Sequence, residues 1–561
     1  MDPFSMSHHE TGWPLRLLHV SSMTSFERQE GNIYRGVTEP EYNCISYTWG
    51  RWMSEDRSIV IDGVNWPIPG VKQDCFSVQN FQQAIHRASQ GVAFIWLDVA
   101  CIDQKHRAVK MAEIGRQAAI FNGARNSFIW LHSAPFANLQ PAVEGLARLS
   151  SMLEEEVREL CGYESPATES SMMSIAGEHD VQLSALCHNT EWLESVLKNL
   201  EVLSQEPWFS SLWTLQEMYL RPDGKILARD ANTISIQSGS HGPITIANII
   251  MYANTIRDQL VKTNRTQDEM EPSHESSIQR ILVLIDQMGL AGSSFNNPCL
   301  LYSAAKHRTS FCSTDRIYGI MQVFGYKLGE AAFPLQSFSL LDLQIQLGAA
   351  FNKSSPVWAQ LFVREKPSQL GKSWLVDEDA AFPDRLQFAE TIPKSLCTID
   401  VDSNGTCQFI GKSCMLEDMA CFWRRSSAVT AVGESTELPA VQDILLDSVA
   451  EVSSISADLR NLSYKNPKQN DLASQLVSHF GDKIRILMVG MLLEGEGETL
   501  DARSEAEEQE EEGEVVGILV VKLGNGETKT WRRVGICLWA SRMEDVCSTD
   551  NLWTEFTGII Q

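Results

Sequence analysis

The spacing of apolar residues alternates between two patterns in the first third of the chain. Extended apolar runs are separated by stretches in which apolar residues recur every three to four positions, such as Val78, Phe81, Ile85 and Ala88. Strands that alternate with amphipathic helices are typical of a parallel sheet with helices packed on its faces. We therefore expect an α/β core over residues 40–135. Its strands are expected at 42–47, 92–100 and 127–131, and its helices at 78–89 and 110–124.

Short Gly-containing turns predict hairpins at three places. Asp62-Gly63, Asn404-Gly405 and Gly524-Asn-Gly526 each separate two extended runs. Asp, Asn and Gly tolerate the positive φ that tight hairpin turns require. Because two of the three turns lie in the C-terminal third, we expect that part to be rich in β-structure. Helical spacing covers the middle of the chain, at 142–160, 192–205 and 243–353.

The length of the chain predicts more than one domain. Single hydrophobic cores stop growing at roughly 250–300 residues, and this chain has 561, of which 43% are apolar and 21% charged. Such a composition is that of a globular protein and excludes a disordered or fibrous one. We expect an N-terminal extension at 1–39, with residues 1–5 as an added leader, a sheet-based domain at 40–235 with a helical insertion at 136–206, a helical region at 236–390, and a β-rich domain at 391–561.

The negative charge of the chain is partly local. The formal net charge is −26, from 46 basic and 72 acidic residues, and residues 494–514 hold eleven of those acids and one Arg. A block of like charges repels itself and stays solvated, so this acidic loop is either a disordered insertion or a docking segment. Since no dense Lys/Arg run occurs, we do not expect a nucleic-acid partner.

Thirteen scattered cysteines without a C-x-x-C pair indicate neither a disulfide framework nor a zinc cluster. We therefore expect a reduced, cytoplasmic protein without a metal site. The longest apolar run, 486–493, is far shorter than the ~20 residues of a membrane-spanning helix. No secretory signal pattern opens the chain, and no membrane span is expected.

Four sequence blocks resemble those of the fungal heterokaryon incompatibility (HET) domain. Tyr42-Asn-Cys-Ile-Ser-Tyr-Thr-Trp-Gly50 is similar to the family's Y-x-x-L-S-Y-x-W-G, and Ile95-Trp-Leu-Asp-Val-Ala-Cys-Ile-Asp-Gln104 to W-I-D-x-x-C-I-N-Q. Trp208-Phe-Ser-Ser-Leu-Trp-Thr-Leu-Gln-Glu217 resembles W-F-x-R-x-W-x-x-Q-E. Arg308 with Asp315-Arg-Ile-Tyr318 resembles a downstream R…D-K-I-Y element. The blocks follow the family's order over residues 40–325.

The chain departs from the family pattern at two positions. Asp103 stands where the family usually has Asn, and Ser211 stands where it usually has Arg. Any role that needs those two family side chains is therefore in doubt here.

The resemblance implies a fold and an activity. HET domains look like distant relatives of the TIR domain, a flavodoxin-like parallel sheet in which some members cleave NAD. Plant-type TIR domains carry S-x-W-C-x-x-E on a late helix, and Ser211, Trp213 and Glu217 keep its Ser, Trp and Glu at the same spacing. The resemblance thus makes Glu217 the catalytic candidate, with NAD or a related nucleotide as substrate and no separate cofactor.

The expected binding residues follow the ends of the strands. Ligands of open α/β sheets bind at the carboxyl ends of the strands, where a glycine lets the backbone approach a phosphate and an indole stacks on a ring. Trp213 and Glu217, four positions apart, would share one side of a helix. The substrate-binding candidates are Ser46, Tyr47, Trp49, Gly50, Asp98, Asp103 and Trp213.

Structural explanations compete with each of these assignments. Trp49, Trp96 and Trp213 are alternatively core residues, and Glu217 alternatively lies on a solvated helix face. Asp98, set among apolar residues, either bonds to neighbouring backbone or is functional.

Other catalytic chemistries lack support in the sequence. Cys44 and Cys101 have no His in the same blocks to act as a base, and His106 and His132 are expected to be ordinary residues. Neither a P-loop nor a G-x-G-x-x-G occurs, so an ATPase or a Rossmann dehydrogenase lacks its signature.

Three functions stay open at this point. The first is a HET protein of self/non-self recognition and regulated cell death that cleaves NAD. The second is a non-catalytic TIR-like module that signals by self-association, as a homo-oligomer. The third is a HET-like enzyme recruited to small-molecule metabolism.

Overall fold

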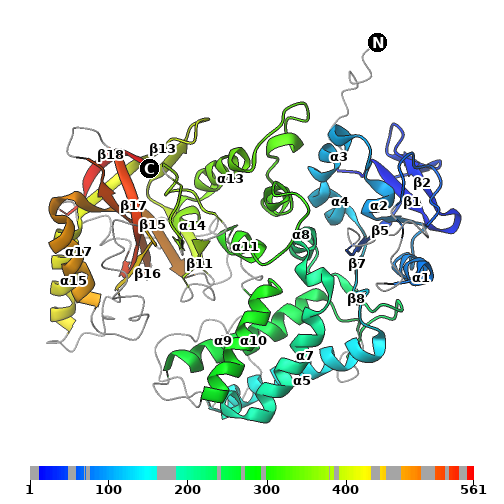
Figure 1. The fold of residues 1–561 in the computed structure, drawn as a ribbon, viewed down its shortest axis with the longest axis horizontal. Helices are drawn as coiled ribbons and strands as arrows, with labels where there is room; N and C mark the ends of the chain where they lie inside the picture. The colour runs from blue at the N-terminus through cyan, green and yellow to red at the C-terminus, as the bar shows by residue number, and fades with distance from the viewer. Residues whose placement is uncertain are drawn as a thin grey trace. The chain divides into compact units, whose positions relative to one another are not determined.

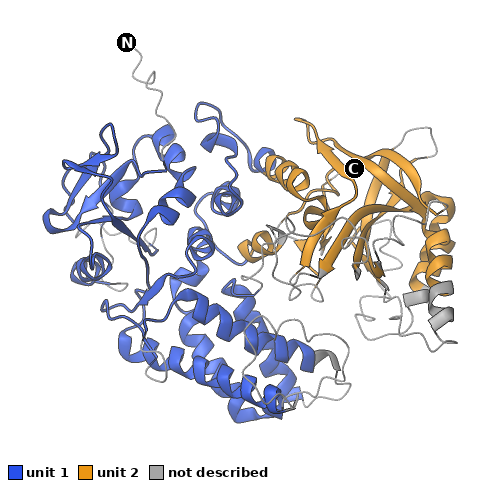
Figure 2. Ribbon diagram, turned by 180° about the vertical axis from the view of Figure 1, so that it is seen from behind, with its two compact units in different colours: residues 1–164, 181–294, 307–343 blue, residues 165–180, 295–306, 344–561 orange. Residues whose placement is uncertain are grey.

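A computed structural model gives the fold (Figure 1). It describes residues 12–48, 59–68, 70, 76–160, 185–236, 242–266, 272–291, 298–364, 366–369, 371–377, 380–383, 391–430, 442–449, 469–494, 512–524, 530–542 and 552–561. The chain packs into two compact units (Figure 2). Unit 1 comprises residues 1–164, 181–294 and 307–343, and unit 2 comprises residues 165–180, 295–306 and 344–561. The four-part division expected from the sequence stays a prediction.

A six-stranded sheet forms the centre of unit 1, in the order β2-β1-β6-β5-β7-β8. The strand β5 is parallel to both β6 and β7, and β7 is parallel to β8. The expected parallel α/β sheet is thus confirmed. The strands are β1 (Arg16–His19), β2 (Thr24–Glu27), β5 (Tyr42–Ser46), β6 (Phe94–Trp96), β7 (Ser127–Trp130) and β8 (Lys225–Leu227).

Two antiparallel strands extend this sheet from a segment that the sequence analysis left without structure. β1 pairs with β6 and β2 pairs with β1, both antiparallel.

Backbone groups next to β2 also explain why the hairpin expected at Asp62-Gly63 does not form. Asp62 bonds through its backbone to Met23 and Ser25 instead, and residues 59–68 contain no strand. A short ladder of β3 (Ile33–Tyr34) and β4 (Val37–Thr38) lies apart from the sheet.

The helices of the sheet domain differ from expectation in two places. The run 92–100 is a strand only at Phe94–Trp96, because Asp98 begins the short helix α2 (Asp98–Cys101). The expected helix 110–124 is two helices, α3 (Arg107–Ile114) and α4 (Gln117–Gly123), divided at Gly115 and Arg116. The helix α1 (Val78–Ala88) begins as predicted, with a capping box between Ser77 and Asn80.

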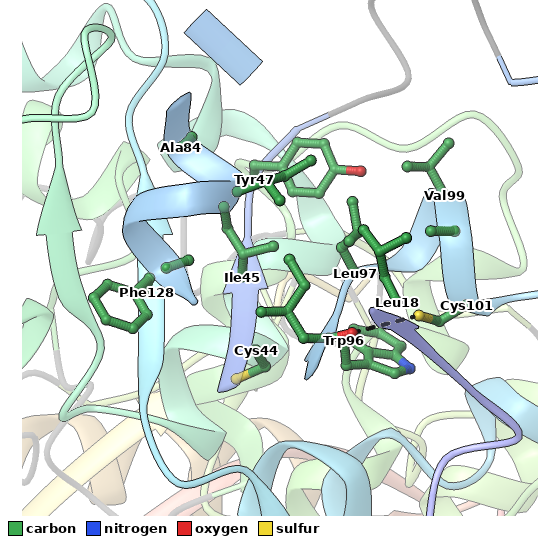
Figure 3. Packing of buried hydrophobic residues seen from close by; sticks show 14 of the residues in the cluster. Leu18, Cys44, Ile45, Tyr47, Ala84, Trp96, Leu97, Val99, Cys101 and Phe128 are labelled. Atoms are coloured by element: carbon green, nitrogen blue, oxygen red, sulfur yellow. Dashed lines mark hydrogen bonds between the residues drawn. The ribbon is translucent and has the colours of Figure 1, made fainter. Parts of the chain in front are cut away.

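The buried faces of the sheet and helices form one apolar core. Figure 3 shows part of it, with Ile45 of β5, Leu18 of β1 and Ala84 of α1 among the packed side chains. Trp96 is buried and its ring meets Phe121 of α4 edge-on, with centroids 5.3 Å apart. The core interpretation of Trp96 is thereby confirmed.

A cluster of long helices belongs to the same unit. In Figure 1 they lie together below the sheet. Ile281, Ile285 and Met288, which showed helical spacing, are buried there. The cluster consists of α5 (Phe136–Leu160), α7 (Thr190–Ser204), α9 (Ile246–Thr266) and α10 (Pro272–Gln287), and the short helices α8 (Leu212–Leu220) and α12 (Asp315–Tyr318) complete the unit's main helices.

Unit 2 is built on an eight-stranded sheet, which confirms the expected β-rich C-terminal part. The strand β13 pairs with β12, β15 and β18, and β15, β16, β17 and β18 pair in succession, so the pairing path closes on itself. The strands are β11 (Thr391–Ser395), β12 (Thr398–Val401), β13 (Cys407–Met415), β14 (Gln442–Leu446), β15 (Ile484–Glu494), β16 (Glu512–Lys522), β17 (Thr530–Arg542) and β18 (Thr554–Ile560).

Two predicted hairpins occur in this sheet. β12 and β13 pair across a turn in which Gly405 has a φ of +75° and Asp402 accepts hydrogen bonds from the backbone of Asn404 and Thr406. β16 pairs with β17, although the tip of that turn lies outside the described residues. The acidic segment connects β15 to β16, and its residues 495–511 also lie outside them. The other elements are α11 (Pro298–Ala305), α13 (Leu340–Ser354), α14 (Pro356–Gln360), α15 (Leu416–Thr430), α17 (Gln469–Phe480), β9 (Val363–Arg364) and β10 (Ala380–Ala381).

Within the described part of the chain, no helix is both long and apolar enough to cross a membrane. In that same part of the chain, no group of three or more His, Cys, Asp or Glu side chains could hold a metal ion.

Candidate functional site

The carboxyl end of β5 meets the helix α8 through a pair of polar side chains. Ser46, the last residue of β5, donates a hydrogen bond from Oγ to Oε2 of Glu217 on α8. The same Oγ accepts a hydrogen bond from the indole Nε1 of Trp208 at 2.7 Å. Ser46 and Trp208 are buried, whereas Glu217 keeps part of its surface exposed. Two residues 171 positions apart in the chain thus form one arrangement.

A second carboxyl group lies at the end of the neighbouring strand β6. The hydroxyl of Tyr47 donates to Oδ1 of Asp98 at 2.6 Å, and the backbone N of Val99 donates to the same oxygen at 2.7 Å. Asp98 is partly exposed. The bond to neighbouring backbone that was one alternative for Asp98 is therefore present, and its functional role stays a prediction.

The environment raises the pKa of both carboxyl groups. The pKa of Glu217 is raised to about 8, because burial of the carboxyl and the nearby Asp98 raise it by more than the Ser46 hydrogen bond lowers it. For Asp98, burial raises the pKa to about 6 against the hydrogen bonds from Tyr47 and Val99. Among the described residues, no cation bonds to either carboxyl. Hydroxyl groups hold them instead.

The next strand, β7, brings a histidine to the same edge of the sheet. His132 follows the carboxyl end of β7 and is buried, and its Nε2 lies 2.8 Å from Oγ1 of Thr48. That His132 is an ordinary residue stays a prediction. Its place two residues after a buried strand is the feature of the sequence that puts it at this edge.

Lys110 of α3 is a second residue that the sequence analysis missed. It lies close enough to lower the pKa values of both Asp98 and Asp315. Its Nζ donates to Oε1 of Gln104 at 3.2 Å, so it is held beside the second sequence block. Only the tertiary arrangement brings it there, and no motif marks it.

Trp213 and Glu217 have different partners despite their helical spacing. The Trp213 side chain lies close to Asp315, at the start of α12. Burial raises the pKa of Asp315, and the backbone of Cys312 and the Trp213 side chain oppose the rise. Lys110 nevertheless lowers the pKa values of both Asp315 and Asp98, so the same cation lies near both carboxyl groups.

Asp103 has a local structural task. Its Oδ1 accepts hydrogen bonds from the backbone N of Lys105 at 2.7 Å and of His106 at 2.9 Å, and its Oδ2 lies 2.9 Å from His106 Nδ1. Burial raises the pKa of Asp103, but these bonds outweigh it and lower the pKa overall. These bonds organise the turn that precedes α3. Its proposed part in substrate binding stays a prediction.

The remaining sequence candidates fall into two groups. Trp49 and Gly50 lie outside the described residues. Cys44 and Cys101 are fully buried, and burial raises the pKa of each thiol to about 12, which makes either a poor nucleophile.

Comparison with known proteins identifies the domain that carries this cluster. Residues 42–217 match the family of the heterokaryon incompatibility protein (HET). The chain contains a HET domain. Neither the curated proteins nor the solved structures include one that matches. Within the HET domain, Ser46 lies near the start of the matched region and Glu217 ends it, and the fold brings them into contact.

Proposed function

We propose that the HET domain cleaves the N-glycosidic bond of NAD or a related nucleotide through Glu217, as part of self/non-self recognition and regulated cell death. The observation that carries the proposal is the Glu217 carboxyl, held by Ser46 at the carboxyl end of β5 and close to Asp98. Ligands of open α/β sheets bind at this edge.

The order of the parallel strands supports a TIR-like, flavodoxin-like interpretation. In chain order β5 is the first parallel strand, β6 the second, β7 the third and β8 the fourth, and in space they lie as β6-β5-β7-β8. This 2-1-3-4 order is that of flavodoxin-like sheets, in which the ligand site lies where the order reverses, beside the first strand. Ser46 ends that first strand.

The family resemblance, and not the count of hydrogen bonds, selects Glu217 over Asp98 as the catalytic group. Asp98 accepts its bonds from Tyr47 and Val99 on Oδ1 alone. Glu217 accepts one bond, on Oε2, and its Oε1 accepts none from the described residues. An oxygen with a free lone pair on a partly exposed residue can face the ribose of a substrate.

The reaction requires an anionic group beside the ribose. When the bond between nicotinamide and ribose breaks, its electron pair goes to the ring nitrogen and neutral nicotinamide leaves. Positive charge grows on the ribose in an oxocarbenium-like state, which a carboxylate stabilises. Water then bonds to the ribose C1 and releases a proton, and ADP-ribose is the second product. The cationic nicotinamide ring itself favours the ionised form of a nearby Glu217.

The test is release of nicotinamide from NAD by the purified full chain, followed by liquid chromatography. We expect Glu217→Gln to lower the rate at least about 100-fold, since it keeps the shape of the side chain and removes the charge. Glu201→Gln, a partly exposed glutamate on α7, is the matched control and is expected to leave the rate unchanged. Nicotinamide release that Glu217→Gln does not reduce contradicts the assignment.

Assembly of the chain without turnover of any nucleotide would instead favour the self-association function. Glu217-dependent turnover of another small molecule would favour the metabolic function.

A further inference from the structure

A segment downstream of the family match contacts the helix that carries Glu217. Residues 307–330 lie in unit 1, after the matched region ends at Glu217. The backbone N of Leu212 donates to the carbonyl of Thr309 at 3.0 Å, and the N of Thr309 donates to the carbonyl of Ser210 at 2.8 Å. Further along, the backbone N of Gln322 donates to the Gln216 side chain at 3.3 Å. The start of α8 is therefore paired with this segment through the main chain.

Arg308 is the buried cation of that segment. Its Nη1 donates to the carbonyls of Trp208 and Ser211 at 3.2 and 3.1 Å and to Oγ1 of Thr214 at 3.1 Å, and its Nη2 donates to the carbonyl of Met288. The side chain is almost completely buried, and no carboxylate among the described residues pairs with it. Burial lowers the pKa of Arg308 to about 9. A buried charge without a counter-ion is costly. Because no carboxylate among the described residues pairs with Arg308, an ion pair does not explain why Arg308 is buried here.

The contacts continue from Arg308 to the candidate catalytic carboxyl. The guanidinium carbon lies 6.0 Å from the centre of the Trp208 ring and bonds to the Trp208 carbonyl. Trp208 is fully buried and donates from Nε1 to Ser46, which donates to Glu217. Because a packed indole cannot shift by itself, the position of Arg308 determines where that N–H points.

We propose that Arg308 is a positioning residue for Glu217, acting through Trp208 and Ser46. The inference rests on the proposed function only for the role of Glu217 in catalysis. It also implies that the HET match alone, residues 42–217, does not contain all the residues that set up the site.

Titration of the Glu217 carboxyl by NMR, on the full chain with 13C-labelled glutamate side chains, tests this without substrate. Loss of the Glu217 signal in Glu217→Gln assigns it. Since the Ser46 hydrogen bond lowers the pKa of Glu217, weakening that bond must raise it. We expect Ser46→Ala, Trp208→Phe and Arg308→Lys each to raise the pKa by about one, the equivalent of a charge-assisted hydrogen bond. Unchanged titration in Arg308→Lys overturns the proposal.

A double substitution separates positioning from general loosening of the structure. If Arg308 acts through Ser46, Arg308→Lys adds no further change in pKa once Ser46→Ala is present, because residues in one network are not additive. Arg221→Lys is the matched control: Arg221 is also buried and donates to the backbone carbonyls of Phe121 and Ala124, at the opposite end of α8. Additive shifts, or an equal shift in Arg221→Lys, contradict the proposal.

The outcomes for the site and for the inference are distinguishable. Trp208→Phe keeps a buried aromatic ring and removes one N–H, so it tests the same link if Arg308→Lys does not fold. If nicotinamide is not released but the carboxyl responds as expected, the proposed function fails and the positioning role stands. If Glu217→Gln abolishes release and Arg308→Lys changes neither kcat nor the pH profile, the function stands and the positioning role fails.

Discussion

Two acidic groups, one in each unit, are held in opposite ways. In unit 2, Asp447 and Arg533 form an ion pair at 2.8 Å with both side chains fully buried, and the backbone N of Arg364 donates to the second carboxylate oxygen at 2.9 Å. In unit 1, Glu217 has a neutral hydroxyl as its partner and remains partly exposed. A carboxylate neutralised by a cation has nothing left to offer a ligand, whereas one held by a hydroxyl retains its capacity to take up charge. This difference, more than burial itself, separates a structural acid from a candidate catalytic one.

The largest expected effect comes from breaking the ion pair of unit 2. Asp447→Ala removes the carboxylate partner of the buried Arg533, and we expect it to lower the free energy of unfolding by about 3–5 kcal/mol. Denaturant unfolding followed by tryptophan fluorescence measures it. The double variant Asp447→Leu with Arg533→Met should recover most of the loss, because it removes both charges. A single variant as stable as the native chain would show that this pair is not structural.

The pH dependence of the reaction comes next in size. The pKa of Glu217 is raised to about 8. Below that pH, the fraction of Glu217 in the carboxylate form rises tenfold for each unit by which the pH rises. Between pH 6 and pH 8 we therefore expect kcat/KM for NAD to rise by about 50-fold and then level off. A profile that is flat over this range would mean that Glu217 is ionised throughout, and it would contradict the raised pKa of Glu217.

Ser46→Ala tests the hydroxyl that holds Glu217. It removes the hydrogen bond to Oε2, and a hydrogen bond to a charged group is worth about 1.5–3 kcal/mol. We expect kcat/KM at pH 7 to fall by at least about tenfold, with the pH profile displaced to higher pH. Recovery of the rate at higher pH distinguishes this effect from simple damage to the fold.

The smallest effect is expected for Tyr47→Phe. Removing the hydroxyl raises the pKa of Asp98, because the Tyr47 bond lowers it. Since Asp98 acts on Glu217 only through its charge, we expect a change in kcat/KM of no more than about threefold at pH 8, where Asp98 remains ionised. A loss as large as that in Ser46→Ala would assign Asp98 a direct part in the reaction.

The sequence predicted those parts of the fold that depend on local patterns. The extended run ending at Ser46, the helix with the Phe81 and Ile85 stripe and the turn at Gly405 all form as expected. The strand β6 was predicted too long, because apolar character alone cannot distinguish a buried strand from the buried helix that begins at Asp98.

Local sequence patterns could not predict the contacts that build the site. The family resemblance singled out Ser46 and Glu217, but their bond joins residues 171 apart, and nothing in the spacing predicts it. Arg308 resembled a family element, yet the carbonyls that it bonds belong to Trp208, Ser211 and Met288, which only the packed unit brings together. Long-range hydrogen bonds to backbone carbonyls leave no trace in residue type at the acceptor.

The closed pairing of the C-terminal sheet has a consequence for synthesis of the chain. β12 and β13 can pair as soon as they leave the ribosome, but β18, which covers the other edge of β13, follows about 140 residues later. At elongation rates of about 5–20 residues per second, this edge stays open for roughly 7–28 s. During that time a strand carrying Cys407 and Phe409, both buried in the finished sheet, is available to other nascent chains. Chaperone dependence during translation is therefore expected to concentrate on this unit.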